Sequence, residues 1–161
     1  MKKLYTLLVL LTLSVTALAQ NGRQLYNKYS DTPGMEAVYI SPAMFRMIGK
    51  IPDMEFQDGE INLSPIIKSM SGFYILTTSN ASVRDALYAD VDKFIKSGQY
   101  ELLMEAKESG SVMRMYTVGD KKTVTSFVML AREADEVSFI SFDGQIDRAQ
   151  MEDLMAQMAK E

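Results

Sequence analysis

The chain has 161 residues, a formal net charge of −4 from 17 basic and 21 acidic side chains, and neither histidine nor cysteine. Binding to nucleic acid or to an anionic membrane surface needs clustered Lys and Arg, so the acidic balance disfavours both. The missing cysteine excludes disulfides and thiolate chemistry, and the missing histidine removes the commonest general base and metal ligand. We therefore predict no cofactor and no nucleic-acid partner.

Residues 1–19 have the pattern of a secretory signal peptide. Lys2 and Lys3 form a short positive region, and an apolar run over residues 4–15 follows. The alternative is an uncleaved membrane anchor, but this run is shorter than the ~20 apolar residues that cross a bilayer. We therefore predict an exported chain that has no membrane span after cleavage and works in the periplasm or cell envelope.

The predicted cleavage site follows the apolar run. Small side chains at Ala17 and Ala19 fit a signal peptidase, which would leave Gln20 as the first residue. Residues 20–161 then form a single domain of 142 residues, and their net charge is −6 because the two leader lysines are lost. A chain of this length can bury a core without disulfides.

The first predicted elements are short. Apolar residues at helical spacing predict a helix around residues 25–29, and a β-branched and aromatic run predicts a strand over residues 37–40. Ser41 followed by proline is typical of a helix N-cap, so we expect a short helix over residues 43–48.

The middle of the chain predicts a loop, a buried strand and the longest helix. Residues 49–60 contain turn formers and alternating acids, and a second Ser-Pro pair then opens a short helix that ends at Met70. The uncharged run over residues 72–78 is typical of a central strand covered on both faces. One apolar stripe over residues 83–95 predicts a helix, which Asn80 can cap.

The second half predicts a four-stranded antiparallel meander followed by a last helix. The turn at Asp143 and Gly144 is expected to end the meander, and Asp147 with Gln150 resembles a capping box at the start of the helix. The expected strands cover residues 100–107, 112–118, 123–132 and 137–142.

The order of these elements predicts an α+β fold. We expect one mainly antiparallel sheet, with the meander at its C-terminal side and helices packed mostly on one face. A meander leaves unpaired strand edges that can pair across a two-fold axis, so a homodimer is a further prediction.

Acidic residues are the main candidates for catalysis or calcium binding, because the pair Ser64 and Lys68 does not have the spacing of serine-lysine enzymes. The loop candidates are Asp53, Glu55, Asp58 and Glu60, and the second group is Asp143 with Asp147. Paired carboxylates could hydrolyse a glycan or peptide without histidine, and the loop acids could bind calcium, although their spacing does not match an EF-hand. Turn formation, capping and solvation explain the same residues better, so we predict no catalytic and no metal-binding residue.

Methionine is unusually frequent, with 13 residues in the chain. In the last predicted helix, four apolar residues fall at positions i, i+3, i+4 and i+7 and form one stripe, namely Met151, Leu154, Met155 and Met158. The stripe either docks on the sheet or forms a partner surface, since flexible thioethers suit both.

Several segments resemble a small family of exported Bacteroidetes proteins that is defined by a domain of unknown function (DUF4252). The resemblance rests on residues 38–41, 75–80, 100–104 and 142–147, together with the leader. It implies a periplasmic or envelope α+β protein and carries no functional residues.

Export, the missing histidine and cysteine and the abundant methionine favour a non-catalytic envelope protein. We expect it to bind a protein partner or a small ligand, as a sensing or accessory subunit. The alternative is a carboxylate-based hydrolase that acts on an envelope polysaccharide or peptide.

Overall fold

The computed structural model describes residues 22–48 and 64–152. Three groups of predicted residues therefore lie outside the described residues: the leader with Ala17, Ala19 and Gln20, the acidic loop with Asp53, Glu55, Asp58 and Glu60, and the stripe residues Leu154, Met155 and Met158. Within the described part, no helix is long and apolar enough to cross a membrane.

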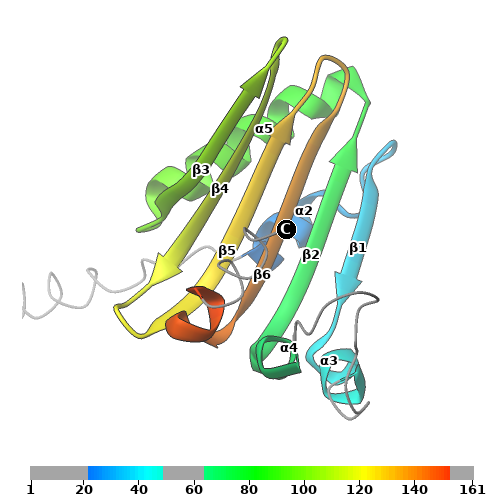
Figure 1. Ribbon diagram of the computed structural model, residues 1–161. Coiled ribbons are helices and arrows are strands. Elements are labelled where there is room, and N and C mark those ends of the chain that lie inside the picture. Colours follow the sequence, from blue (N-terminus) through cyan, green and yellow to red (C-terminus); the bar gives the residue numbers. More distant parts are fainter. Residues whose placement is uncertain (1–21, 49–63, 153–161) are drawn as a thin grey trace, which may run out of the picture.

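The described residues form one six-stranded sheet in which all neighbouring strands are antiparallel (Figure 1). The strand order is β1-β2-β6-β5-β4-β3, so the predicted meander β3 to β6 is confirmed and β6 also pairs with β2. The strands are β1 (Glu36–Ile40), β2 (Met70–Thr78), β3 (Glu101–Glu108), β4 (Ser111–Gly119), β5 (Thr123–Arg132) and β6 (Val137–Asp147).

The two helices α2 and α5 lie against the same face of the sheet, behind it in Figure 1. We call this side the covered face and the opposite side the open face. The α+β class and the placement of helices mostly on one face are thus confirmed. The helices are α2 (Gly22–Tyr29), α3 (Pro42–Ile48), α4 (Ser64–Ser69) and α5 (Ala81–Ser97), and a helical turn follows β6 at residues 148–152.

The core lies between the covered face and α5. Leu76, Val128 and Phe139 project from three adjacent strands and are fully buried. The predicted stripe of α5 meets them, and its Phe94 ring packs edge-on against Phe139 at 6.4 Å between centroids. Alternate strand residues and one helical stripe therefore close this side of the sheet.

Three predicted caps are confirmed. The Asn80 side chain accepts a hydrogen bond from the Ser82 amide at 3.0 Å, and the Ser41 hydroxyl accepts one from the Met44 amide at 3.3 Å. Asp147 accepts hydrogen bonds from the two amides of residues 149 and 150 at 2.9 and 3.3 Å. Each cap satisfies amides that have no partner within their own helix.

The predicted turn at Asp143 and Gly144 is wrong, because β6 continues through both residues to Asp147. Gly144 pairs with Met70 of β2. A Cβ atom at Gly144 would lie 2.6 Å from the carbonyl oxygen of Ser69, so glycine is required here for close backbone approach. Glycine, which is common in turns, therefore lies within a strand at this position.

The prediction that the strand at residues 72–78 is covered on both faces also differs from the structure. Tyr74, Leu76 and Thr78 of β2 are buried on the covered face. Phe73 and Ile75 project to the other side and are only half-buried, because the described helices α2 and α5 lie on one face alone.

Candidate binding surface

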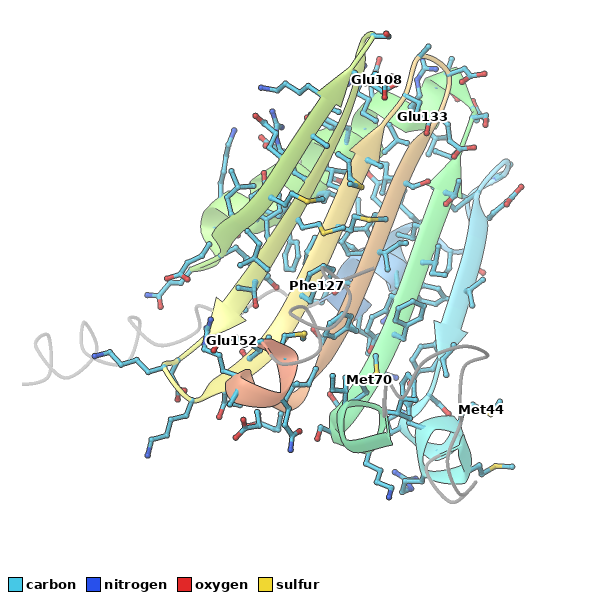
Figure 2. All side chains as sticks on the ribbon, in the orientation of Figure 1. Met44, Met70, Glu108, Phe127, Glu133 and Glu152 are labelled. Carbon is cyan, nitrogen blue, oxygen red and sulfur yellow. The ribbon has the colours of Figure 1, made fainter. Side chains whose placement is uncertain are left out.

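The open face presents an apolar surface built from alternate residues of the strands. In β5, for example, Val128 and Leu130 are buried on the covered face, whereas Phe127 and Met129 are half-buried on the open face. Phe127 is labelled in Figure 2. A strand that is apolar on both sides does not suit a sheet with one solvated face, where polar residues alternate with apolar ones. The open face therefore has the composition of an interface.

Strand register arranges the open-face residues in rows that cross the sheet. One row contains an apolar residue from each of the six strands, and half of its members are methionines. We call it the middle row, and it runs in order through Met104, Met115, Met129, Ile140, Ile75 and Val38.

The next row toward the end of β6 is aromatic. Phe127 and Phe142 are directly paired, and their rings stack at 4.8 Å between centroids with an interplanar angle of 7°. Phe73 and Ile40 continue this row on β2 and β1, and Thr117 continues it on β4. We call these five residues the aromatic row.

The border of the open face is acidic. Strand pairing places Glu36, Glu101 and Glu108 on this side, and all three are exposed residues at strand ends. Among the described strands, no Lys or Arg projects to this face, since Lys107, Arg114 and Arg132 all lie on the covered side. The surface thus combines an uncharged apolar centre with negative charge at its corners.

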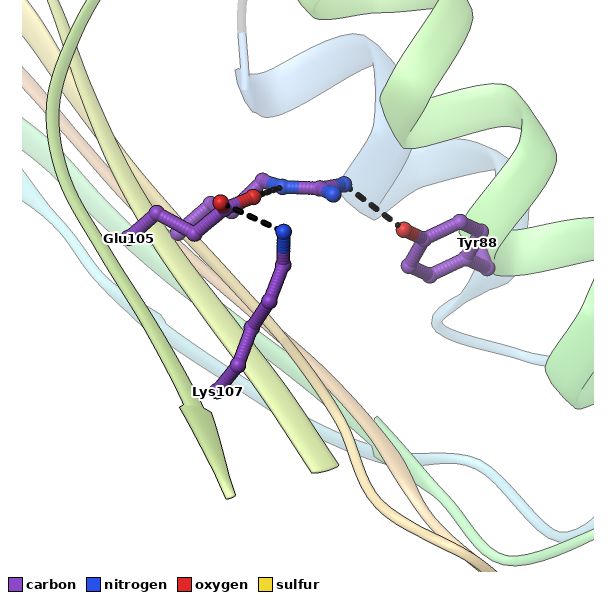
Figure 3. A network of polar contacts seen from close by, with 4 residues as sticks. Tyr88, Glu105 and Lys107 are labelled. Carbon is purple, nitrogen blue, oxygen red and sulfur yellow. Dashed lines mark hydrogen bonds and ion pairs between the residues drawn. The ribbon is translucent and has the colours of Figure 1, made fainter. Parts of the chain in front are cut away.

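By contrast, the covered face carries charges of both signs, and several of them form ion pairs. Arg114 donates to Glu105 at 2.6 Å and to the Tyr88 hydroxyl of α5 at 3.0 Å, and Lys107 lies 2.7 Å from Glu105 (Figure 3). Hydrogen bonds from Lys107 and Arg114 hold the pKa of the Glu105 carboxyl below its usual value. This network connects the edge strand β3 to α5, and each of its four side chains has a partner within it.

Asp143 has a half-buried carboxyl on the covered face. Burial raises its pKa, and a hydrogen bond from Ser126 opposes that shift. Ser126 also accepts a hydrogen bond from the Tyr100 hydroxyl at 3.1 Å. A carboxyl in such surroundings could act as a single acid.

The predicted carboxylate pair is not formed. Asp143 lies opposite Ser126 on the covered face, whereas Asp147 lies beyond a register shift, opposite Thr123, and caps the turn after β6. The buried Ile146 points to the covered face between them, so Asp143 and Asp147 project to opposite sides. Among the described residues, no group of three acids could hold a metal ion.

The model of one family, described as Domain of unknown function (DUF4252), matches residues 29–154. The chain belongs to this family. The matched range contains all six described strands of the DUF4252 domain, and hence both faces of its sheet. No curated protein and no solved structure matches the chain.

The predicted partner stripe of the DUF4252 domain is described only at Met151. This side chain is half-buried in the turn after β6, whereas its neighbours Gln150 and Glu152 are exposed. Sequence reasoning missed the open face itself. The available signal was that residues 127, 129, 140 and 142 are apolar at the strand positions between the buried ones.

Proposed function

We propose that this chain is a non-catalytic, exported envelope protein that binds a protein partner on the open face of its sheet. The observation that supports this most is the middle row, which extends across all six strands without a charge. Large uncharged apolar surfaces mark interaction sites on soluble domains. Methionine side chains adapt their shape to a partner at low cost, which suits Met104, Met115 and Met129 to this role.

The acidic corners define the chemistry of the partner. A segment that presents apolar side chains flanked by Lys or Arg would match the uncharged centre and also Glu36, Glu101 and Glu108. Such corner charges contribute mainly to the rate and specificity of association, and their effect falls with salt. We therefore expect an amphipathic protein segment with basic flanks rather than an acidic one.

The test is site-specific photocrosslinking in the native envelope. A photoreactive residue at Met129, in the centre of the open face, should capture one defined protein, and the same residue at exposed Glu133 should not. Capture from position 129 should be lost in Met115→Lys, which places a charge on the paired residue of the middle row, and kept in Met47→Lys, which places the same charge on an exposed methionine of α3. Equal capture from both positions, or none from Met129, would contradict the proposal.

Export has its own test. Protein recovered from the envelope should begin at Gln20, as the residues before it predict. An intact N-terminus on protein from the cytosol would contradict export and leave the binding surface unaffected.

The hydrolase alternative is supported by one observation, the raised pKa of Asp143. If Asp143 were a catalytic acid, purified protein would turn over a cell-wall glycan or peptide. Asp143→Asn would abolish that activity, and Asp147→Asn would not, because Asp147 faces the opposite side. No turnover in the unaltered protein would exclude this alternative.

A further inference from the structure

Four methionines lie next to one another on the open face, on the strands β3, β4 and β5. Met104 pairs with Met115, and Met115 pairs with Met129 across the next ladder. Met113 precedes Met115 by two residues on β4 and therefore projects to the same face. Met104 is 41% exposed, and the other three are half-buried. We call these four residues the methionine cluster, in which Met115 has a methionine on three sides.

The residues on either side of Met113 are small. Met113 pairs with Ala106 on β3 and with Ala131 on β5. An alanine side chain ends at Cβ, so both positions leave room above the sheet for longer neighbouring side chains. Methionine is unbranched and has three rotatable side-chain bonds, so its sulfur atom can adjust its position. The strand register therefore allows three thioether sulfur atoms of the cluster to meet at one point.

The spacing of the cluster suits the coordination of one ion by three sulfur atoms. Opposed residues have Cβ atoms about 5 Å apart, diagonal residues about 7–8 Å, and residues two apart along a strand about 6.7 Å. Met113, Met115 and Met129 form a triangle with these sides, and Met104 replaces Met129 in a second triangle. The centre of either triangle is roughly 4 Å from each Cβ atom. A sulfur atom two bonds beyond Cβ can reach an ion above that centre with a bond of about 2.3 Å, the length of a zinc–sulfur bond.

The donor atoms determine which ions suit the cluster. Thioethers are soft ligands that select Cu(I), and Ag(I) has the same preference, whereas Mg²⁺ and Ca²⁺ prefer oxygen ligands. The chain contains no histidine and no cysteine, so no imidazole or thiolate of its own competes for a soft cation. The cluster therefore matches the ligand chemistry of a soft monovalent cation.

The charges of the open face also favour a cation. Glu101 and Glu108 lie at the two ends of β3 on this side, and both are exposed. Lys107 and Arg114 of β3 and β4 lie on the covered side. The charged residues of β3 on the open face are therefore both negative, and they attract a cation toward the cluster.

We propose that the methionine cluster is a binding site for a soft monovalent cation, Cu(I) or Ag(I), which three of its four thioethers hold at a time. The site goes beyond the proposed function, because it requires no protein partner. It departs from the prediction of no metal-binding residue, which rests on the acidic residues alone. Met104 and Met129 are 25 positions apart in the sequence, and only strand pairing brings both of them beside Met115.

The test is titration of the purified full chain with Ag(I) in a chloride-free buffer, followed by isothermal titration calorimetry. Silver is the probe because it needs no reductant to keep its charge. Met115→Leu removes the central sulfur atom and keeps an apolar side chain of similar size, so the fold should be retained. This variant should bind Ag(I) at least about tenfold more weakly, because losing even a group that only supports a metal ligand costs about 10–100-fold in affinity.

The matched control is the double variant Met44→Leu with Met47→Leu, which removes two exposed methionines of α3. It should bind Ag(I) as tightly as the unaltered chain. Far-ultraviolet circular dichroism checks that both variants are folded. Equal affinity in Met115→Leu and in this control, or no binding by the unaltered chain, would overturn the proposal.

A second readout locates the ion. In a chain with isotope-labelled methionine methyl groups, Ag(I) should shift the nuclear magnetic resonance signals of the cluster and leave those of Met44 and Met47 unchanged. Single Met→Leu variants assign the signals, because each removes one of them. Ca²⁺ at the same concentration should shift none of the cluster signals, since it prefers oxygen ligands. Ag(I)-dependent shifts confined to methionines outside the cluster would overturn the proposal.

The test is independent of the proposed function. Met115→Leu removes a thioether but keeps the open face apolar, so capture from position 129 in the envelope should persist in this variant while Ag(I) binding is weakened. Silver binding is measured on purified protein without a partner, and capture is measured without added silver. Failure of one is therefore distinguishable from failure of the other.

Discussion

Both faces of the sheet are apolar, but the described helices α2 and α5 pack against only one of them. On the covered face, α5 buries its stripe against Leu76, Val128 and Phe139. Ion pairs lie beside this core, for example Arg114 with Glu105 and Arg132 with Asp85. On the open face, most residues of the middle and aromatic rows are half-buried, whereas Val38 and Met104 on the edge strands are exposed, and the charges at the corners have one sign. The covered face thus accounts for stability, and the open face has the features of a surface that accepts a ligand.

The largest expected difference between the faces is in stability. Leu130 and Met129 are neighbours on β5 and similar in size, but Leu130 is 2% exposed on the covered face and Met129 is half-buried on the open face. Leu130→Ala should lower the free energy of unfolding by about 2–5 kcal/mol and Met129→Ala by about 1 kcal/mol. Urea denaturation followed by circular dichroism measures both, and equal losses would show that the two faces are equally closed.

A second prediction concerns Gly144, where the backbone of β6 lies close to the carbonyl group of Ser69. Gly144→Ala should destabilise the protein by about 1–3 kcal/mol, because the new methyl group would meet the Ser69 carbonyl. Gly110→Ala is the comparison, since Gly110 has no atom near its Cβ position but has a φ of 91°, which strains any other residue. Thermal unfolding should rank both variants below the unaltered protein. An unchanged melting temperature for Gly144→Ala would contradict the account of β6.

Acid is expected to weaken a contact between α2 and α5. Hydrogen bonds from Lys28 and Tyr29 hold the pKa of Asp90 below its usual value, and the Tyr29 contact is 2.5 Å. Because the folded-state pKa is lowered, this contribution is complete above the unfolded value of about 3.9 and is lost as the pH falls through the folded value. Tyr29→Phe should cost about 1 kcal/mol at pH 7 and progressively less below about pH 4. A cost that is the same at both pH values would contradict the assignment.

The smallest effect is expected to have the opposite sign. Burial raises the pKa of Asp143, so its ionised form destabilises the fold, and the protein loses stability as the pH rises through the folded value. Asp143→Asn should therefore unfold at slightly higher denaturant concentration at pH 7. Below about pH 3.9 the difference should disappear, because the carboxyl is then protonated in both states. Met129→Ala carries no titratable group and should show no such pH dependence.

The elements of the fold were predictable from sequence, but the candidate surface was not. The caps at Ser41, Asn80 and Asp147 are local, since each involves a side chain and amides no more than three residues away. The middle row is not local, because it joins Val38 to Met104 through four other strands. Periodicity shows which residues share a face of one strand, and only the register shows which strands lie side by side.

The error at Gly144 has the same origin. A glycine after an aspartate is typical of a turn, and nothing in its neighbourhood in the sequence indicates that Ser69 and Met70 lie against it. The class of fold followed from hairpins between consecutive strands, but the place of β2 beside β6 depended on a contact across more than sixty residues.

The position of β6 between β2 and β5 also has a consequence for the order in which the protein can fold. During synthesis from the N-terminus, the β1–β2 pair and the β3–β5 hairpins are complete before residues 137–147 leave the ribosome. Until then, the β1–β2 pair and the strands β3 to β5 are not joined by backbone hydrogen bonds, because β6 lies between them in the sheet. The six-stranded sheet can therefore be completed only after residues 137–147 are available to join its two parts.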